Sequence, residues 1–182
     1  MEKYKGLYRI PSARLRFTNY GRNGLYFVTI CTADKRYYFG NISSPGIMNL
    51  SPVGNYARQC WSEIPKHFPF VHLSEFVVMP NHIHGILAFR KSEAALKELT
   101  TSNKFQNQKQ NLASIIGTFK SAVTRYAKQN EIPFKWQARY YDRIIRTPEE
   151  CDSIKAYICN NIMHWIKESL DRKSGSAGMP RP

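Results

Sequence analysis

The stretch "LSEFVVMPNHIHGILAF", residues 73–89, consists of two apolar segments separated by a Pro-Asn pair. Aromatic and β-branched residues predict a strand in each segment, over 73–80 and 82–89. Pro80-Asn81 is typical of a tight turn, so we expect the two strands to lie side by side as an antiparallel hairpin.

The segments on either side of this hairpin alternate between strand and helix patterns. "LYFVTICTA" (25–33) and "FKWQARYYDRIIRT" (134–147) are typical of strands. Helical spacing of apolar residues follows Ser51-Pro52, and "LASIIGTFKSAVTRYAKQ" (112–129) is amphipathic. The order βαββαβ predicts an α+β, ferredoxin-like domain with one antiparallel sheet, helices on one face and a further C-terminal helix.

The rest of the chain divides by composition. We expect a basic N-terminal segment over 1–24, one domain over 25–170 and a disordered tail over 171–182. Inside the domain, residues 90–111 are polar and rich in Gln and Asn, which predicts a mobile surface insertion.

The charge of the chain restricts its partners. Among 182 residues there are 27 Lys and Arg against 13 Asp and Glu, a formal net charge of +14. Such a surface attracts polyanions and favours nucleic acid; a basic protein without such a partner, or one that touches anionic lipid, is the alternative. The four cysteines form no CxxC pair, and no apolar stretch has membrane length, so we expect a cytoplasmic protein without a zinc knuckle or a membrane partner.

A histidine pair is the first candidate site. Side chains alternate along a strand, so His82 and His84 share one face while Ile83 points to the other. Two imidazoles on one face can chelate a divalent ion, although two exposed or hydrogen-bonded histidines would show the same pattern. With one oxygen ligand, such a site suits Mg²⁺ or Mn²⁺ shared with a phosphate.

The C-terminal helix carries the second candidate site. Thr147 precedes Pro148 with capping-box spacing, and we expect the helix to run to about Leu170. Beside its apolar stripe, Tyr157, Asn161 and His164 recur at helical spacing. The phenol is a candidate nucleophile toward a metal-polarised phosphate, and the Asn161 carbonyl a candidate third ligand.

Two alternatives to this assignment stay open. Tyr157 could simply pack with its hydroxyl at the water edge. Tyr140 and Tyr141 compete as nucleophiles, although a tyrosine pair on a strand more often packs or stacks on a base.

Four motifs in this order resemble a known family: "VVMPNHIHGIL", "IIGTFKSAVT", "WQARYYDRIIRTPEE" and "YICNN". They are similar to the single-tyrosine HUH transposases of the IS200/IS605 type, and most of all to the branch called REP-associated tyrosine transposases. The resemblance runs from about Arg14 to Trp165. It departs from the family pattern at Ile162, where many relatives have Pro, and at Arg143, where many have His.

The resemblance implies a metal-dependent endonuclease and strand transferase. His82 and His84 match the HUH metal motif, Asn161 the amide that completes it, and Tyr157 the catalytic tyrosine. In such enzymes the tyrosine attacks single-stranded DNA beside a hairpin, forms a 5′-phosphotyrosine and frees a 3′-hydroxyl that can later rejoin strands. A catalytically idle relative that only binds nucleic acid, and a metal-dependent hydrolase unrelated to DNA, are the alternatives.

The resemblance also divides the basic residues. Arg14, Arg16 and Arg22 lie in the segment with which relatives read bases at the foot of the hairpin. Lys120 and Arg125 are expected to face outward from a helix, where contact with phosphate is the natural role. Each could instead be an ordinary solvated charge. Related enzymes include monomers and dimers with shared active sites, so a homodimer is one of two open assemblies.

Overall fold

The computed structural model describes residues 3–4, 7–8, 21–43, 46–101 and 110–167. Its centre is an antiparallel sheet with the strand order β6 (Val71–Met79), β7 (His82–Phe89), β3 (Gly24–Cys31) and β8 (Tyr141–Ile145). In chain order this is the βαββαβ arrangement, so the predicted ferredoxin-like α+β fold is confirmed.

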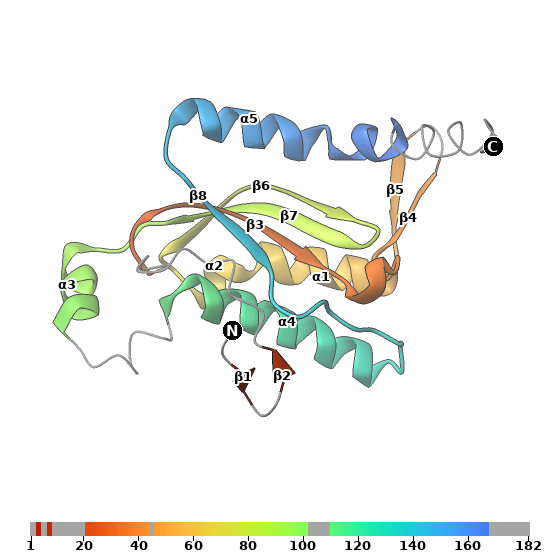
Figure 1. Ribbon diagram of the computed structural model, residues 1–182, viewed down its shortest axis with the longest axis horizontal. Helices are drawn as coiled ribbons and strands as arrows, with labels where there is room; N and C mark the ends of the chain where they lie inside the picture. The colour runs from red at the N-terminus through yellow and green to blue at the C-terminus, as the bar shows by residue number, and fades with distance from the viewer. Residues whose placement is uncertain (1–2, 5–6, 9–20, 44–45, 102–109, 168–182) are drawn as a thin grey trace.

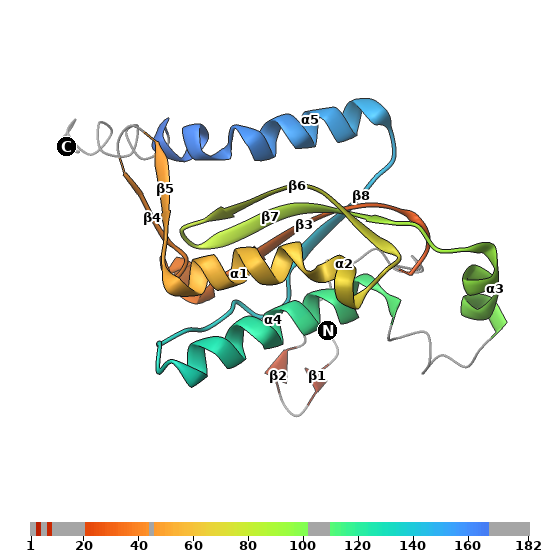
Figure 2. The same cartoon turned by 180° about the vertical axis from the view of Figure 1, so that it is seen from behind.

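Helices cover both faces of the sheet (Figures 1 and 2). One face carries α1 (Pro52–Ser62), the short α2 (Ile64–His67) and α4 (Leu112–Gln129). The other face carries α5 (Pro148–Cys159), which is followed by a separate helical stretch over 161–167. Among the described helices, α5 and the 161–167 stretch are therefore the ones on that side of the sheet.

Smaller elements surround this core. They are the hairpin β1 (Lys3–Tyr4) and β2 (Leu7–Tyr8), the hairpin β4 (Gly40–Ser43) and β5 (Ile47–Leu50), the 3-10 helix η1 (Ala33–Lys35) and α3 (Glu93–Thr101). None of the helices in the described part of the chain is long and apolar enough to cross a membrane.

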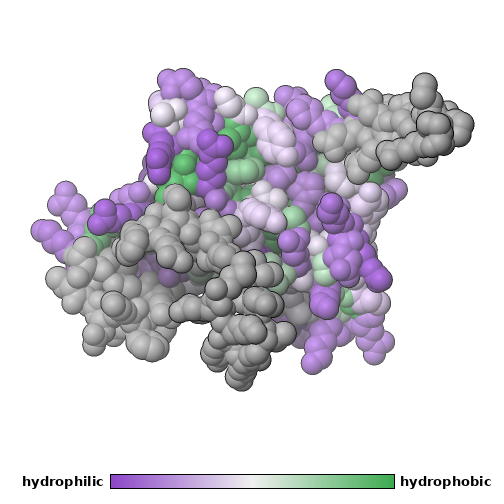
Figure 3. Space-filling model, in the orientation of Figure 1, coloured by the Kyte–Doolittle hydropathy of each residue, from purple (hydrophilic) through white to green (hydrophobic). Residues whose placement is uncertain are grey.

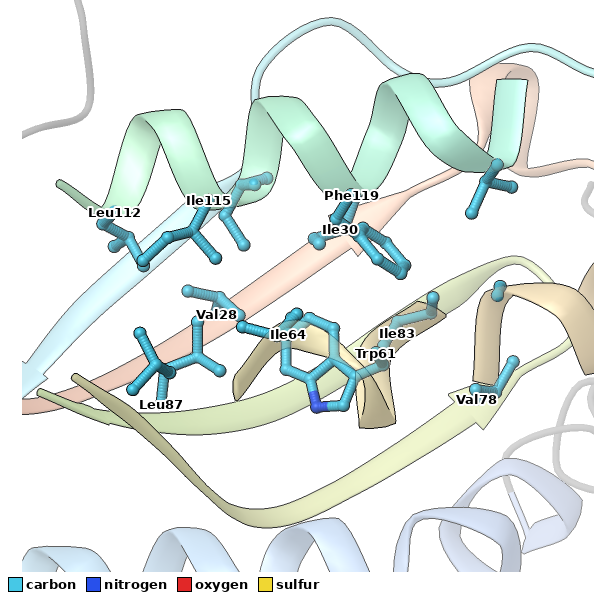
Figure 4. Close-up of a cluster of buried hydrophobic side chains, with 14 of the residues drawn as sticks. Val28, Ile30, Trp61, Ile64, Val78, Ile83, Leu87, Leu112, Ile115 and Phe119 are labelled. Carbon is cyan, nitrogen blue, oxygen red and sulfur yellow. The ribbon is translucent and has the colours of Figure 1, made fainter. Parts of the chain in front are cut away.

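The main core lies between the sheet and the α1/α4 layer (Figure 4). Alternation along β7 sends Ile83 and Leu87 into it, where they meet Trp61 of α1 and Phe119 of α4. Gly85 points the same way, and a Cβ added there would lie 2.3 Å from Cζ2 of Trp61. The indole of Trp61 therefore packs directly against the backbone at Gly85, where any side chain larger than hydrogen would clash with it.

Caps define the helix starts that the sequence predicted. Ser51 Oγ accepts from the Gly54 amide at 3.0 Å, and Thr147 Oγ1 accepts from the Glu150 amide at 3.2 Å. The Glu150 carboxylate does not reach back to Thr147 but accepts from the Arg146 amide at 2.9 Å. The start of α5 is thus fixed from two directions.

Two predicted elements are shorter than expected. The strand predicted over 134–147 covers only Tyr141–Ile145, because Arg139 adopts a left-handed φ of 67° that ends the extended run. Upstream of it, Trp136 forms an isolated bridge with Thr32.

The helix predicted from Pro148 to about Leu170 is interrupted at Asn160, where φ is −92° and ψ is 4°. Of the other predicted segments, 90–111 contains α3, while 102–109 and the tail 171–182 lie outside the described residues.

Candidate active site

The histidine pair lies on the sheet face beneath α5. In the pairing of β7 with β3, His84 is opposite Thr29 and His82 is opposite Cys31. The two imidazole centroids are 4.5 Å apart, and Ile83 between them is fully buried on the opposite face. The structure therefore places both imidazoles as strand alternation predicts.

The turn before β7 fixes the tautomer of His82. Asn81 Nδ2 donates to the Lys35 carbonyl at 3.1 Å, which turns Asn81 Oδ1 toward His82 Nδ1 at 2.7 Å. An amide oxygen only accepts, so His82 Nδ1 carries the proton and Nε2 keeps its lone pair. Asn81 thus prepares the ring nitrogen that a metal ion would need.

His84 sits deeper. Its Nδ1 lies 2.8 Å from the Thr29 hydroxyl, and its ring stacks on Phe27 with centroids 5.4 Å apart. Burial lowers the pKa of His84 to about 3, helped by the nearby His82. Burial also lowers the pKa of His82 to about 4, against the opposing hydrogen bond to Asn161. Both imidazoles are therefore neutral at pH 7, the form that binds metal ions.

Tyr157 approaches the pair from α5. Its hydroxyl lies 3.3 Å from Nε2 of His84, and the residue as a whole is 42% exposed. The next residue, Ile158, is buried with Ile86 of β7 and Ile145 of β8. This small second core seats α5 on the sheet and leaves the phenol at the edge, reachable from solvent.

Asn161 completes the cluster from the start of the 161–167 stretch. It is 5% exposed, and its side chain hydrogen-bonds to His82. Trp165 holds this stretch, since its ring centroid is 5.9 Å from that of His82 and 5.5 Å from that of Tyr37.

The β4–β5 hairpin supports the same stretch from the outside. A Cβ added at Gly46, in the turn of the hairpin, would lie 3.1 Å from Cδ1 of Ile166. Figure 1 shows the hairpin standing upright against this end of the C-terminal helical segment.

The donor set fits a weakly held divalent cation. Nε2 of His82, Nε2 of His84 and the Asn161 carbonyl supply two nitrogens and one oxygen, which leaves positions for phosphate oxygens. In the described part of the chain, no group of three His, Cys, Asp or Glu residues could hold a metal. A metal here would need the amide as its third ligand.

Three of the predicted DNA-binding residues lie in the described part of the chain, away from this cluster. Arg22 is exposed before β3, and Arg125 is exposed on α4, in the layer opposite α5. Lys120 of α4 is half-buried, and its Nζ donates to the carbonyls of Gln137 at 2.8 Å and Arg139 at 3.0 Å. Arg14 and Arg16 lie outside the described residues.

Sequence reasoning missed the residues that orient the histidines. Thr29 and Phe27 lie 55 and 57 positions before His84, and only the strand register brings them to it. The role of Asn81 could have been predicted from the sequence, because it directly precedes His82 and closes the hairpin.

The comparisons agree with this fold. A solved structure of a REP-associated tyrosine transposase bound to a REP hairpin matches with a TM-score of 0.59 at 15% identity, over 85% of this chain and 74% of that one. The chain therefore has the fold of that class of transposase, as the sequence motifs predict. No protein-family model matches the chain.

An uncharacterized protein of Haemophilus influenzae is 39% identical over 171 residues, which is 91% of this chain and 94% of the relative. The chain belongs to the same family as that protein.

Proposed function

We propose that this chain is a metal-dependent, transposase-like enzyme that cuts and rejoins single-stranded DNA through Tyr157. The observation that carries the proposal is the 3.3 Å approach of the Tyr157 hydroxyl to Nε2 of His84, beside a second neutral imidazole and a buried amide. All of these groups come from one chain.

The reaction would be a transesterification. The Tyr157 oxygen bonds to phosphorus while the bond from phosphorus to the 3′ oxygen breaks, which leaves a 5′-phosphotyrosine and a 3′-hydroxyl. The phenol loses its proton to water, which reaches the half-exposed ring, and the departing 3′ oxygen takes one up. One phosphodiester replaces another, so the 3′-hydroxyl can attack in reverse and join strands.

The histidines and Asn161 would hold Mg²⁺ or Mn²⁺ in this scheme. When bound, the ion neutralises charge on the phosphate oxygens. The role of Thr29 and Asn81 is to keep the imidazole Nε2 atoms pointed at one place, so that the phosphate and the phenol oxygen meet in a fixed orientation.

Hairpin DNA is the proposed substrate. The formal charge of +14 favours a polyanion, and the similar transposase structure contains a REP hairpin. We therefore expect cleavage in a single-stranded flank of a hairpin.

The test uses hairpin oligonucleotides labelled on the 3′ side of the cleaved bond, the part that stays joined to Tyr157. The wild type and Tyr157→Phe are compared in Mg²⁺ or Mn²⁺. A labelled band at protein mass in denaturing gels, mapped to Tyr157 by mass spectrometry and lost in Tyr157→Phe, supports the proposal. Specific hairpin binding without any adduct, in any flank sequence, would instead favour the catalytically idle DNA-binding protein.

A further inference from the structure

The edge strand β8 presents a row of side chains beside the candidate nucleophile. It is the last strand of the sheet, and it pairs only with β3 among the described strands. Tyr141 pairs with Thr29, and Arg143 pairs with Phe27, so both share the sheet face of His84. Tyr140 and Ile144 point the other way, into the main core.

Tyr141 stands in line with the histidine pair. His84, Thr29 and Tyr141 are direct neighbours across three strands, and the Thr29 hydroxyl touches the His84 ring. With strands about 4.8 Å apart, the backbone of Tyr141 lies roughly 10 Å from that of His84. A nucleotide next to one held at Tyr157 would reach this position.

The ring of Tyr141 is available. Tyr141 is 57% exposed, whereas Tyr26 of β3 is buried and Tyr140, which directly precedes β8, is half-buried. Within the residues that the structure describes, the Tyr141 side chain forms no hydrogen bond and no ring contact. Packing therefore does not account for an aromatic side chain at this place.

Arg143 adds a fixed cation two residues along the same face. Its Nε forms a 2.6 Å ion pair with Glu150 Oε1, and Glu150 is itself held by the Arg146 amide. The Arg143 side chain nevertheless stays 69% exposed. A guanidinium anchored in this way is placed for a phosphate that adjoins a base at Tyr141.

The surface beyond Arg143 is hollowed. A cavity of about 410 Å³ lies where β3 and β8 meet the start of α5, lined among others by Leu25, Ile145 and Cys151. Figure 3 shows an apolar patch (green) among hydrophilic side chains on this face. Along the β8 edge, the ring of Tyr141, the guanidinium of Arg143 and this apolar cavity therefore follow one another.

We propose that Tyr141 is a stacking platform for the base next to the phosphodiester attacked by Tyr157, with Arg143 contacting the adjoining phosphate. The proposal rests on the proposed function and deepens it. Stacking on an aromatic ring is tolerant of base identity, so this platform holds the strand in place without reading its sequence.

The test replaces one flank base at a time by 2-aminopurine, whose fluorescence falls on stacking, in a hairpin oligonucleotide and in an unstructured oligothymidine. All variants carry Tyr157→Phe, so that no DNA is cut. We expect quenching at one position beside the cleaved bond. Tyr141→Leu should abolish it and weaken binding roughly tenfold or more.

Two matched variants identify stacking as the cause. Tyr141→Phe and Tyr141→Trp keep a ring without the tyrosine hydroxyl, so both should retain quenching and affinity. Equal quenching in Tyr141→Leu, or its loss in Tyr141→Phe, would overturn the platform. Thermal unfolding of each variant checks that the fold survives.

The two proposals fail separately. An adduct at Tyr157 in the wild type, together with unchanged binding in Tyr141→Leu, overturns the platform and leaves the enzyme. Ring-dependent quenching without an adduct on any oligonucleotide overturns the enzyme and leaves Tyr141 as a stacking site in a DNA-binding protein.

Discussion

The hydroxyl of Tyr157 and Nε2 of His84 lie 3.3 Å apart, although 73 positions separate them in the chain. The approach depends on how α5 is seated, because Ile158 packs on Ile86 of the histidine strand. The phenol and the imidazole are thus held close together by the packing of α5 on the sheet, and ion pairs of α5 with β6 (Lys155–Glu75, 3.6 Å) and with β8 (Arg143–Glu150, 2.6 Å) support the same seating.

Removal of the Tyr157 hydroxyl is expected to stop chemistry and leave the fold. Tyr157→Phe deletes one partly exposed hydrogen bond, so the free energy of unfolding should change by about 1 kcal/mol or less. Hairpin binding should persist while the covalent adduct disappears. Tyr141→Phe is the control and should still form the adduct; an adduct in Tyr157→Phe would disprove the assignment.

Loss of either histidine should remove metal binding as well as cleavage. We expect EDTA to stop cleavage and Mg²⁺ or Mn²⁺ to restore it in the wild type. His82→Ala and His84→Ala should not recover, and Mn²⁺ titrations followed by electron paramagnetic resonance should show a lost site. His72→Ala changes an exposed histidine on β6 and should behave as wild type. Cleavage by metal-free wild type would contradict the prediction.

Gly85 is expected to resist even a methyl group. Gly85→Ala would place a Cβ 2.3 Å from the Trp61 ring, and such overpacking typically costs about 1–3 kcal/mol. Gly117→Ala is the matched control, because apart from neighbouring backbone of α4 itself no atom lies within 4 Å of its added Cβ. We expect that variant to gain roughly 0.5–1 kcal/mol. Urea unfolding of both measures the difference, and equal stabilities would refute the packing argument.

Lys91 should make stability depend on alkaline pH. Its buried Nζ donates to the carbonyls of Gly21 at 2.8 Å and Gln110 at 2.6 Å, and burial lowers its pKa from 10.5 to about 8. Between these two values the unfolded chain binds more protons than the folded one. The free energy of unfolding therefore rises with pH across that window.

Lys91→Met should remove this rise. The measurement compares urea unfolding of wild type and variant from pH 7.5 to 10, so that charges common to both cancel. A constant difference between the two proteins over this range would show that Lys91 does not titrate there.

Arg125 and Lys120 should differ although both lie on α4. Arg125→Gln is expected to reduce the salt dependence of hairpin binding by roughly 0.7 to 0.9 in slope, if Arg125 meets a phosphate. Lys120→Gln should chiefly lower the thermal stability, because it frees the carbonyls of Gln137 and Arg139. The reverse pattern would assign the phosphate contact to Lys120.

Local patterns predicted the parts of the fold that local physics sets. The Pro80-Asn81 turn, the caps at Ser51 and Thr147, and the helix over 112–129 needed only propensity and spacing. The face shared by His82 and His84 followed from strand alternation. Tyr157 and Asn161 were placed together by helical spacing, even though the helix breaks at Asn160 between them.

Tertiary contacts set what the sequence did not predict. The strand register brings Thr29 to His84, and the sequence around Thr29 does not predict that contact. The short β8 results from the left-handed Arg139 and from Lys120, which holds the preceding loop. The sequence did not predict the burial of Lys91, because its hydrogen-bond partners are backbone carbonyls at distant positions in the chain.

The alternation of β7 places two different evolutionary constraints on the four residues 82–85. His82 and His84 face the candidate chemistry, while Ile83 and Gly85 face the core. A descendant that kept the fold for another task would be free to replace the histidines, yet would still need the small and apolar residues between them. Conservation of both histidines among close relatives would show that selection acts on the proposed reaction, whereas their loss beside an unchanged Ile83 and Gly85 would show that it acts on the fold alone.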